Sequence, residues 1–116
     1  MADTVRKVHY YSTSVPNKPG ETFRVLAALV SGGVNLLACS GTTHGRSARI
    51  DVVPDDTRKF AVAARKAGLA FSEKRSGFLV QGDDRPGALA DSLKLLADAG
   101  INVDAVDGLS AGSGRW

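Results

Sequence analysis

The chain of 116 residues is 43% hydrophobic and 23% charged, and its formal net charge at pH 7 is +3. These proportions are typical of a globular protein and exclude a disordered or fibrous one. The longest apolar run, Val25–Val30, is too short to span a bilayer, and Met1–Thr4 does not begin a secretory signal. Cys39 is the only cysteine, which excludes an internal disulfide and a cysteine cluster for a metal. We therefore expect a cytoplasmic protein.

Positive charge is concentrated in the first two thirds of the chain. Residues 1–76 hold twelve Lys and Arg against six Asp and Glu, whereas residues 77–116 hold three against six. The first segment therefore has a net charge of +6 and the second a net charge of −3. A basic segment can attract nucleic acid or another anion. Because the basic residues are dispersed rather than clustered, we favour an ordinary solvated surface.

In chain order, residues 1–76 predict strands and helices in the order βαββαβ. The first helix follows Pro19-Gly20 and has an apolar stripe formed by Phe23, Leu26, Ala27 and Val30. The second follows Pro54-Asp55-Asp56 and has a stripe formed by Phe60, Ala63, Ala64 and Ala67. Strands are expected at Lys7–Val15, Leu36–Ser40, Ser47–Val53 and Leu69–Lys74, with a turn at Gly41–Gly45. This order predicts an α+β fold, a ferredoxin-like sandwich with two helices on one face of a four-stranded antiparallel sheet.

The chain contains an internal repeat with an offset of 67 residues. Asn17-Lys18-Pro19-Gly20 corresponds to Asp84-Arg85-Pro86-Gly87, and Gly33-Val34-Asn35 corresponds to Gly100-Ile101-Asn102. In both copies the glycine after the helix is a candidate C-terminal cap with positive φ. The second copy is expected to have a strand at Phe78–Gln81, a helix with Leu89, Leu93 and Leu96 on its apolar side, and a strand at Val103–Leu109.

The sequence ends before the third strand, second helix and fourth strand of the second copy. We therefore expect two units, a first at residues 1–76 and a truncated second at residues 77–116. A chain of this length cannot bury two independent cores, so we expect the two units to share one. The uncovered sheet edge and helix surface of a truncated unit favour association, and we expect a homodimer.

The pattern of strand, Pro-Gly turn, amphipathic helix, Gly-(Val/Ile)-Asn and strand resembles the ACT domain. ACT domains are βαββαβ regulatory modules that bind amino acids and related metabolites, and the resemblance covers nearly the whole chain. The chain is most similar to the stand-alone tandem type, because no catalytic domain is attached. The resemblance implies a regulatory protein that binds an amino acid or a related carboxylate, with no cofactor and no enzymatic activity.

The resemblance also implies six ligand-binding residues, in the strand-to-helix loops and at the starts of the following strands. They are Asn17, Gly20 and Asn35 in the first copy and Asp84, Gly87 and Asn102 in the second. The residue types suit this role, because N–H groups at a helix start attract a carboxylate and glycine lets the backbone approach a ligand. Asp84 departs from the Asn of the pattern, and a carboxylate there would suit an ammonium group. Helix capping is the alternative role for Asn17 and Asp84.

Other functions have less support in the sequence. His9, His44 and Cys39 are scattered and lack metal-ligand spacing, so we expect neither a metal site nor catalysis from them. The same βαββαβ order underlies RNA recognition motifs, which stack bases on aromatic side chains of their strands. Tyr10 and Tyr11 keep this alternative open, although the third strand has no aromatic residue. A ligand-free dimerisation module is the remaining alternative, and no membrane partner is expected.

Overall fold

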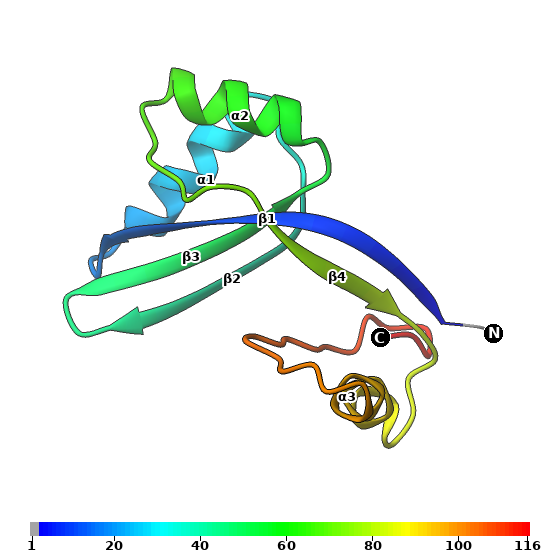
Figure 1. Ribbon diagram of the computed structural model, residues 1–116. Coiled ribbons are helices and arrows are strands. Elements are labelled where there is room, and N and C mark those ends of the chain that lie inside the picture. Colours follow the sequence, from blue (N-terminus) through cyan, green and yellow to red (C-terminus); the bar gives the residue numbers. More distant parts are fainter. Residues whose placement is uncertain (1–2) are drawn as a thin grey trace. The chain divides into compact units, whose positions relative to one another are not determined.

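The computed structural model describes residues 3–116 (Figure 1). The elements in chain order are β1 (Thr4–Pro16), α1 (Glu21–Ser31), β2 (Leu36–His44), β3 (Ser47–Pro54), α2 (Thr57–Lys66), β4 (Arg75–Gln81) and α3 (Ala88–Asp98). The first six elements have the βαββαβ order that the sequence predicts. No helix within residues 3–116 is long and apolar enough to cross a bilayer, and α1 and α3 have 11 residues each.

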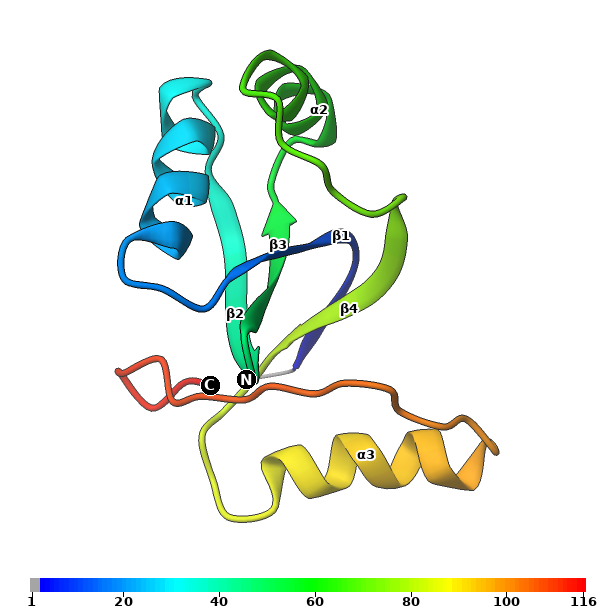
Figure 2. The same ribbon diagram turned by 90° about the vertical axis from the view of Figure 1, so that its left-hand side faces the viewer.

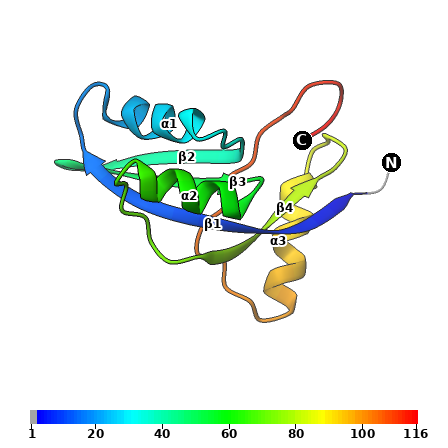
Figure 3. The same ribbon diagram turned by 90° about the horizontal axis from the view of Figure 1, so that it is seen from above.

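The four strands form one sheet in the order β2-β3-β1-β4. β1 and β2 are both antiparallel to β3, and Val52 of β3 lies opposite Tyr11 of β1 and opposite Cys39 of β2. α1 and α2 lie side by side on the same face of this sheet (Figure 2 and Figure 3). The ferredoxin-like α+β sandwich predicted from the sequence is therefore confirmed.

The hydrophobic core lies between the sheet and these two helices. Ile50 and Val52 alternate along β3 and are almost completely buried, and Val25 and Leu29 of α1 are 1% exposed. Phe60 of α2 packs in the same core and stacks on Tyr11, with 4.3 Å between the ring centroids. Every buried hydrophobic residue in the part of the chain that the structure describes lies between Val8 and Ala64.

The face of α1 that packs on the sheet differs from the predicted one. Phe23 and Val30, two members of the predicted stripe, are 75% and 70% exposed, whereas Val25 and Leu29 are buried. Seven of the eight residues from Phe23 to Val30 are apolar, so apolar side chains surround the helix. Periodicity cannot select one face of such a helix, and contact with the sheet decides which face is buried.

The fourth strand lies further along the chain than predicted. Leu69–Lys74 forms no regular strand, although Leu69 and Phe71 pack against the core. One backbone bond joins this segment to β1, from the N–H of Ser72 to the carbonyl of Ser12 at 2.7 Å. Side chains make the neighbouring bonds: Thr13 Oγ1 donates to the carbonyl of Ala70 at 2.7 Å, and the backbone N–H of Ser12 donates to Ser72 Oγ at 2.9 Å. β4 begins only at Arg75, and it includes Phe78–Gln81, which was predicted to open the second copy.

Two further boundaries were predicted wrongly. β2 continues to His44, so the Gly41–Gly45 segment is largely strand rather than turn. Val103–Leu109 forms no strand, and its large apolar side chains are exposed, Leu109 at 73%. An extended apolar segment becomes a strand only when a neighbouring strand supplies its hydrogen bonds, and in residues 3–116 none pairs with this one.

The chain divides into two compact units, Lys7–Gly77 and Phe78–Trp116, the second including the start of β1. In the second unit α3 has the same length as α1 and begins and ends 67 residues later. The predicted glycines with positive φ are confirmed at Gly33 and Gly100, where φ is 77° and 74°. α3 buries no side chain completely, and only Leu93 and Leu96 of its apolar stripe are half-buried. A core shared by the two units stays a prediction.

Candidate functional site

The loop before α1 contains two of the predicted site residues, Asn17 and Gly20. The backbone N–H of Asn17 donates to the carbonyl of Arg46 at 2.8 Å, and its side-chain Nδ2 donates to the carbonyl of Gly45 at 3.1 Å. Asn17 therefore ties the loop to the turn between β2 and β3. The helix-capping role considered for Asn17 is wrong, because Gly20 is the N-cap of α1 and no side chain caps this helix.

The loop before α3 repeats this backbone geometry. Gly87 is the N-cap of α3 with φ 86°, close to the 85° of Gly20, and again no side chain caps the helix. Asp84 does not cap α3 either: its carboxylate accepts a hydrogen bond from Ser110 Oγ at 2.9 Å. Both glycines have a left-handed backbone that a β-branched residue adopts only with strain. A valine at either position would therefore distort the loop as well as block a ligand.

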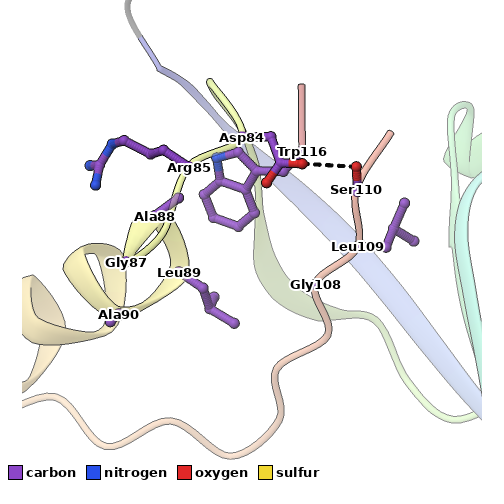
Figure 4. Close-up of a pocket in the computed structure, with 10 residues that line it drawn as sticks. All are labelled: Asp84, Arg85, Gly87, Ala88, Leu89, Ala90, Gly108, Leu109, Ser110 and Trp116. Carbon is purple, nitrogen blue, oxygen red and sulfur yellow. Dashed lines mark hydrogen bonds between the residues drawn. The ribbon is translucent and has the colours of Figure 1, made fainter. Parts of the chain in front are cut away.

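A pocket of about 340 Å³ lies at the start of α3 (Figure 4). Residues from the loop, the first turn of α3 and the segment after α3 line it. They are Asp84, Arg85, Gly87, Ala88, Leu89, Ala90, Gly108, Leu109, Ser110 and Trp116. Figure 4 shows the indole ring of Trp116 beside the start of the helix and Asp84 bonded to Ser110 across the pocket. All of these residues belong to the unit Phe78–Trp116.

Of the two charged side chains that line this pocket, Arg85 is already paired within the chain and Asp84 has no cationic partner. The guanidinium of Arg85 pairs with the Asp91 carboxylate at 2.6 Å, and this hydrogen bond raises the pKa of Arg85 further above its usual value. Arg85 Nη1 also donates to the carbonyl of Pro86 at 3.3 Å. Asp84 is exposed and its one hydrogen-bonding side chain is the neutral Ser110, so its negative charge has no cationic partner there. The pocket therefore offers a carboxylate to a cationic group.

Unlike Asp84, which suits a cation, the start of α3 favours an anion. Ala88, Leu89 and Ala90 form its first turn and line the pocket, so the positive end of the helix opens into it. No side chain caps this turn, which leaves backbone N–H groups for an anion. Leu89 and Leu109 supply apolar surface to the same pocket. One small space thus combines a site for an anion, a site for a cation and an apolar wall.

The other predicted residues are not brought into this pocket. Asn102 is exposed and does not line it. In the first copy, the Asn35 side chain lies 3.5 Å from the Asp55 carboxylate, and its carbonyl accepts a hydrogen bond from the backbone N–H of Asp55 at 3.0 Å. Asn35 therefore links the end of α1 to the segment that begins α2. Of the six predicted residues, Asp84 and Gly87 are the two that share this pocket.

Several residues of the pocket were not predicted from the sequence. Leu89 was assigned to the apolar side of its helix, and Leu109 to a strand. Ser110 and Trp116 follow that segment and belong to no motif, so the sequence has no signal for them. Arg85 lies inside the repeated loop motif, and its position between Asp84 and Gly87 was the one signal available.

The reactive side chains considered earlier have different environments. Cys39 is exposed at its surface, yet desolvation by neighbouring atoms, and then the negative charge of Asp51, raise the pKa of its thiol. Its thiolate is therefore scarce at neutral pH, which makes Cys39 a weak nucleophile. No group of three His, Cys, Asp or Glu within residues 3–116 is arranged to hold a metal ion. Tyr11 is stacked on Phe60 in the core, so it cannot stack a base on the open sheet face.

Solved structures with low sequence identity have the same fold. A protein from Bacteroides thetaiotaomicron has a TM-score of 0.73 at 17% identity, over 96% of this chain and 76% of that chain. The regulatory subunit of aspartate kinase from Thermus thermophilus, in a ligand-free form, has a TM-score of 0.69 at 15% identity, over 97% and 82%. E. coli aspartokinase III in complex with lysine and aspartate has a TM-score of 0.54 at 16% identity, over 99% and 28%. No protein-family model matches the sequence, and no curated protein is similar enough to count as a match.

Proposed function

We infer from the ACT-like fold of this chain, which the similar structures confirm, that it is a regulatory module that binds an amino acid. The observation that carries this proposal is the pocket at the start of α3, where Asp84 and Gly87 lie together. In this proposal the chain acts by binding and has no catalytic residues of its own. Two of the similar structures support the proposal further: one is the regulatory subunit of an aspartate kinase, and the other is an aspartokinase in complex with lysine and aspartate.

The chemistry of the pocket matches the three parts of an α-amino acid. The carboxylate of the ligand would accept hydrogen bonds from backbone N–H groups in the first turn of α3. Its ammonium group would pair with the Asp84 carboxylate, which has no cationic partner within the pocket. An apolar side chain would lie against Leu89 and Leu109. A carboxylate without an ammonium group would lose the contact with Asp84 and bind less tightly.

A screen against the twenty amino acids tests this function. We expect at least one of them to raise the melting temperature, because a ligand that binds only the folded chain stabilises it. At a free concentration of 100 times its Kd, the ligand adds about 2.7 kcal/mol to the free energy of unfolding. In a domain of this size that gain raises Tm by roughly 10 °C. A screen in which no amino acid raises Tm, repeated by calorimetry with the same result, would contradict the proposal.

Exposed apolar side chains support a second proposal, that the chain forms a homodimer. Leu95 and Leu109 are each 73% exposed and Ile101 is 54% exposed, all within the unit Phe78–Trp116. Interaction sites in soluble proteins expose more large apolar side chains than the rest of the surface. Light scattering should give twice the mass of one chain, and Leu95→Lys should shift the mass towards that of a monomer.

The control for this experiment is Val62→Lys, which introduces the same charge on α2 at a side chain that is 40% exposed. It should leave the dimer unchanged, because Val62 lies in the other unit. A wild-type chain that remains monomeric at high concentration would show that this apolar surface does not drive self-association.

A further inference from the structure

A second pocket, of about 520 Å³, lies on the sheet face opposite α1 and α2. Residues of β1, β3, the end of β2 and the segment before β4 line it, and all belong to the unit Lys7–Gly77. Strand alternation explains why its lining is polar. Ala48, Ile50 and Val52 of β3 face the helices. Arg49 lies between Ala48 and Ile50 and therefore faces the opposite side of the sheet. The pocket shares no residue with the one at the start of α3.

Most hydroxyl groups of this pocket are already engaged as donors. Four of them donate to acceptors of the protein itself, those of Ser12, Thr13, Ser47 and Ser72. These bonds fix the orientation of the side chains, and the hydroxyl oxygens of Ser12 and Ser72 also accept hydrogen bonds, from Arg49 Nη2 at 3.3 Å and from the backbone N–H of Ser12 at 2.9 Å. They also leave few hydroxyl protons for a ligand, so other groups must supply the donors.

Two arginines and one serine supply those donors. The side chain of Arg75 takes part in no ion pair or hydrogen bond within residues 3–116, although Arg75 lines the pocket. Arg49 uses Nε for the Asp51 carboxylate at 3.0 Å and Nη2 for Ser12 Oγ at 3.3 Å, which leaves Nη1 uncommitted. The hydroxyl of Ser14 has no partner in the described chain either. Uncommitted hydrogen-bond donors of Ser14 on β1, Arg49 on β3 and Arg75 on β4 therefore line one pocket and have no acceptor among the described residues.

The charge of the pocket favours an anion. Arg49 and Arg75 carry two positive charges, and Asp51 offsets one of them through its contact with Arg49. The surrounding unit is also basic, since residues 1–76 have a net charge of +6. Guanidinium groups recognise phosphate through paired N–H donors, and a phosphate group has three oxygens to accept bonds from separate directions. A planar carboxylate has only two.

We propose that this pocket binds a small phosphomonoester, with the phosphate held by Arg75, Arg49 and Ser14. The volume of the pocket exceeds that of a bare phosphate, which leaves room for the organic part of the ligand. The protein would then respond to two ligands of different chemistry, a phosphorylated compound on the sheet and an amino acid at α3.

Calorimetric titration of the full chain with phenyl phosphate at low salt tests this proposal. Phenyl phosphate should bind saturably and more tightly than inorganic phosphate, because its ring fills the part of the pocket that a bare phosphate leaves empty. Arg75→Gln should weaken binding about tenfold or more, since it removes a charge-assisted hydrogen bond. Ser14→Ala should weaken it by a smaller factor and leaves both arginines in place.

The matched control is Arg65→Gln, which removes the same charge from the last turn of α2, outside the pocket. It should leave the affinity for phenyl phosphate within about twofold, because only long-range charge is lost. Equal losses in Arg65→Gln and Arg75→Gln would overturn the proposal in favour of non-specific attraction. A single-stranded RNA decamer that binds more tightly than phenyl phosphate and depends on Arg75 would also overturn it, in favour of a nucleic-acid surface. Binding of the amino acid, measured in parallel, should be unaffected by Arg75→Gln, so failure of one proposal does not imply failure of the other.

Discussion

Asp84→Ala should weaken the binding of an α-amino acid by about tenfold or more, the cost of losing one charge-assisted hydrogen bond. The same substitution should change the affinity for the deaminated analogue by no more than about threefold, because that analogue has no ammonium group to pair with Asp84. The structure explains the expected selectivity, since the Asp84 carboxylate lies in the pocket and bonds only to the neutral hydroxyl of Ser110 there. Calorimetric titrations of both ligands against both proteins give the four affinities required.

Ser110→Ala is the matched control for this prediction. It removes the hydrogen bond to Asp84 but retains the carboxylate, so the amino acid should keep most of its affinity. If Asp84→Ala weakened both ligands equally, the carboxylate would be acting on the loop and not on the ammonium group. The proposed orientation of the ligand would then be wrong, even if the pocket itself were correct.

Leu29→Ala should lower the free energy of unfolding by about 2–5 kcal/mol, the usual cost of truncating a fully buried leucine. Leu29 is 1% exposed and lies on the face of α1 that packs in the core with Ile50 and Val52. A single domain of this size is stabilised by only about 5–15 kcal/mol, so this change is a large part of the total. Urea denaturation followed by far-UV circular dichroism measures the loss.

Val30→Ala provides the comparison, because Val30 is next to Leu29 on α1 but is 70% exposed. Its truncation should change the unfolding free energy by no more than about 0.5 kcal/mol. Similar losses in the two variants would mean that the buried face of α1 has been assigned incorrectly.

The sequence was informative where local chemistry decides the structure. The starts and ends of α1 and α3 follow from Pro-Gly turns and from glycines that adopt positive φ, and these features depend on a few adjacent residues. The stripe of α2 was predicted correctly at Phe60, Ala63 and Ala64, because charged residues occupy the other side of that helix. In α1 no charged face opposes the apolar one, and the predicted face was wrong.

The remaining errors arise where distant residues decide the structure. Leu69–Lys74 has the composition of a strand, but beside the backbone bond from Ser72 to Ser12 its contacts with β1 are side-chain bonds from Thr13 and to Ser72, which do not make a regular ladder. Val103–Leu109 also resembles a strand, yet it has no partner within residues 3–116. Hydrogen bonds between strands join residues far apart in the chain, and a pattern in one segment does not specify them.

The candidate site could be predicted in part for the same reason. Asp84 and Gly87 belong to a repeated motif, and both line the pocket at α3. Leu109, Ser110 and Trp116 reach the pocket because the chain turns back after α3, which no local pattern indicates. The basic pocket on the sheet was also invisible, since Ser14, Arg49 and Arg75 come together only through strand pairing.

The incomplete burial of α3 has a consequence for the way in which a ligand would act. A helix of 11 residues is barely stable by itself, and α3 buries no side chain that would hold it firmly in place. The unit Phe78–Trp116 therefore has a low free energy of local unfolding compared with the core around Leu29. A ligand at the start of α3 stabilises the folded form of that unit, so binding and local folding become one equilibrium. Its effect would be a change in how often this part of the chain is ordered, and a partner that recognises only the ordered form would detect the ligand without touching it.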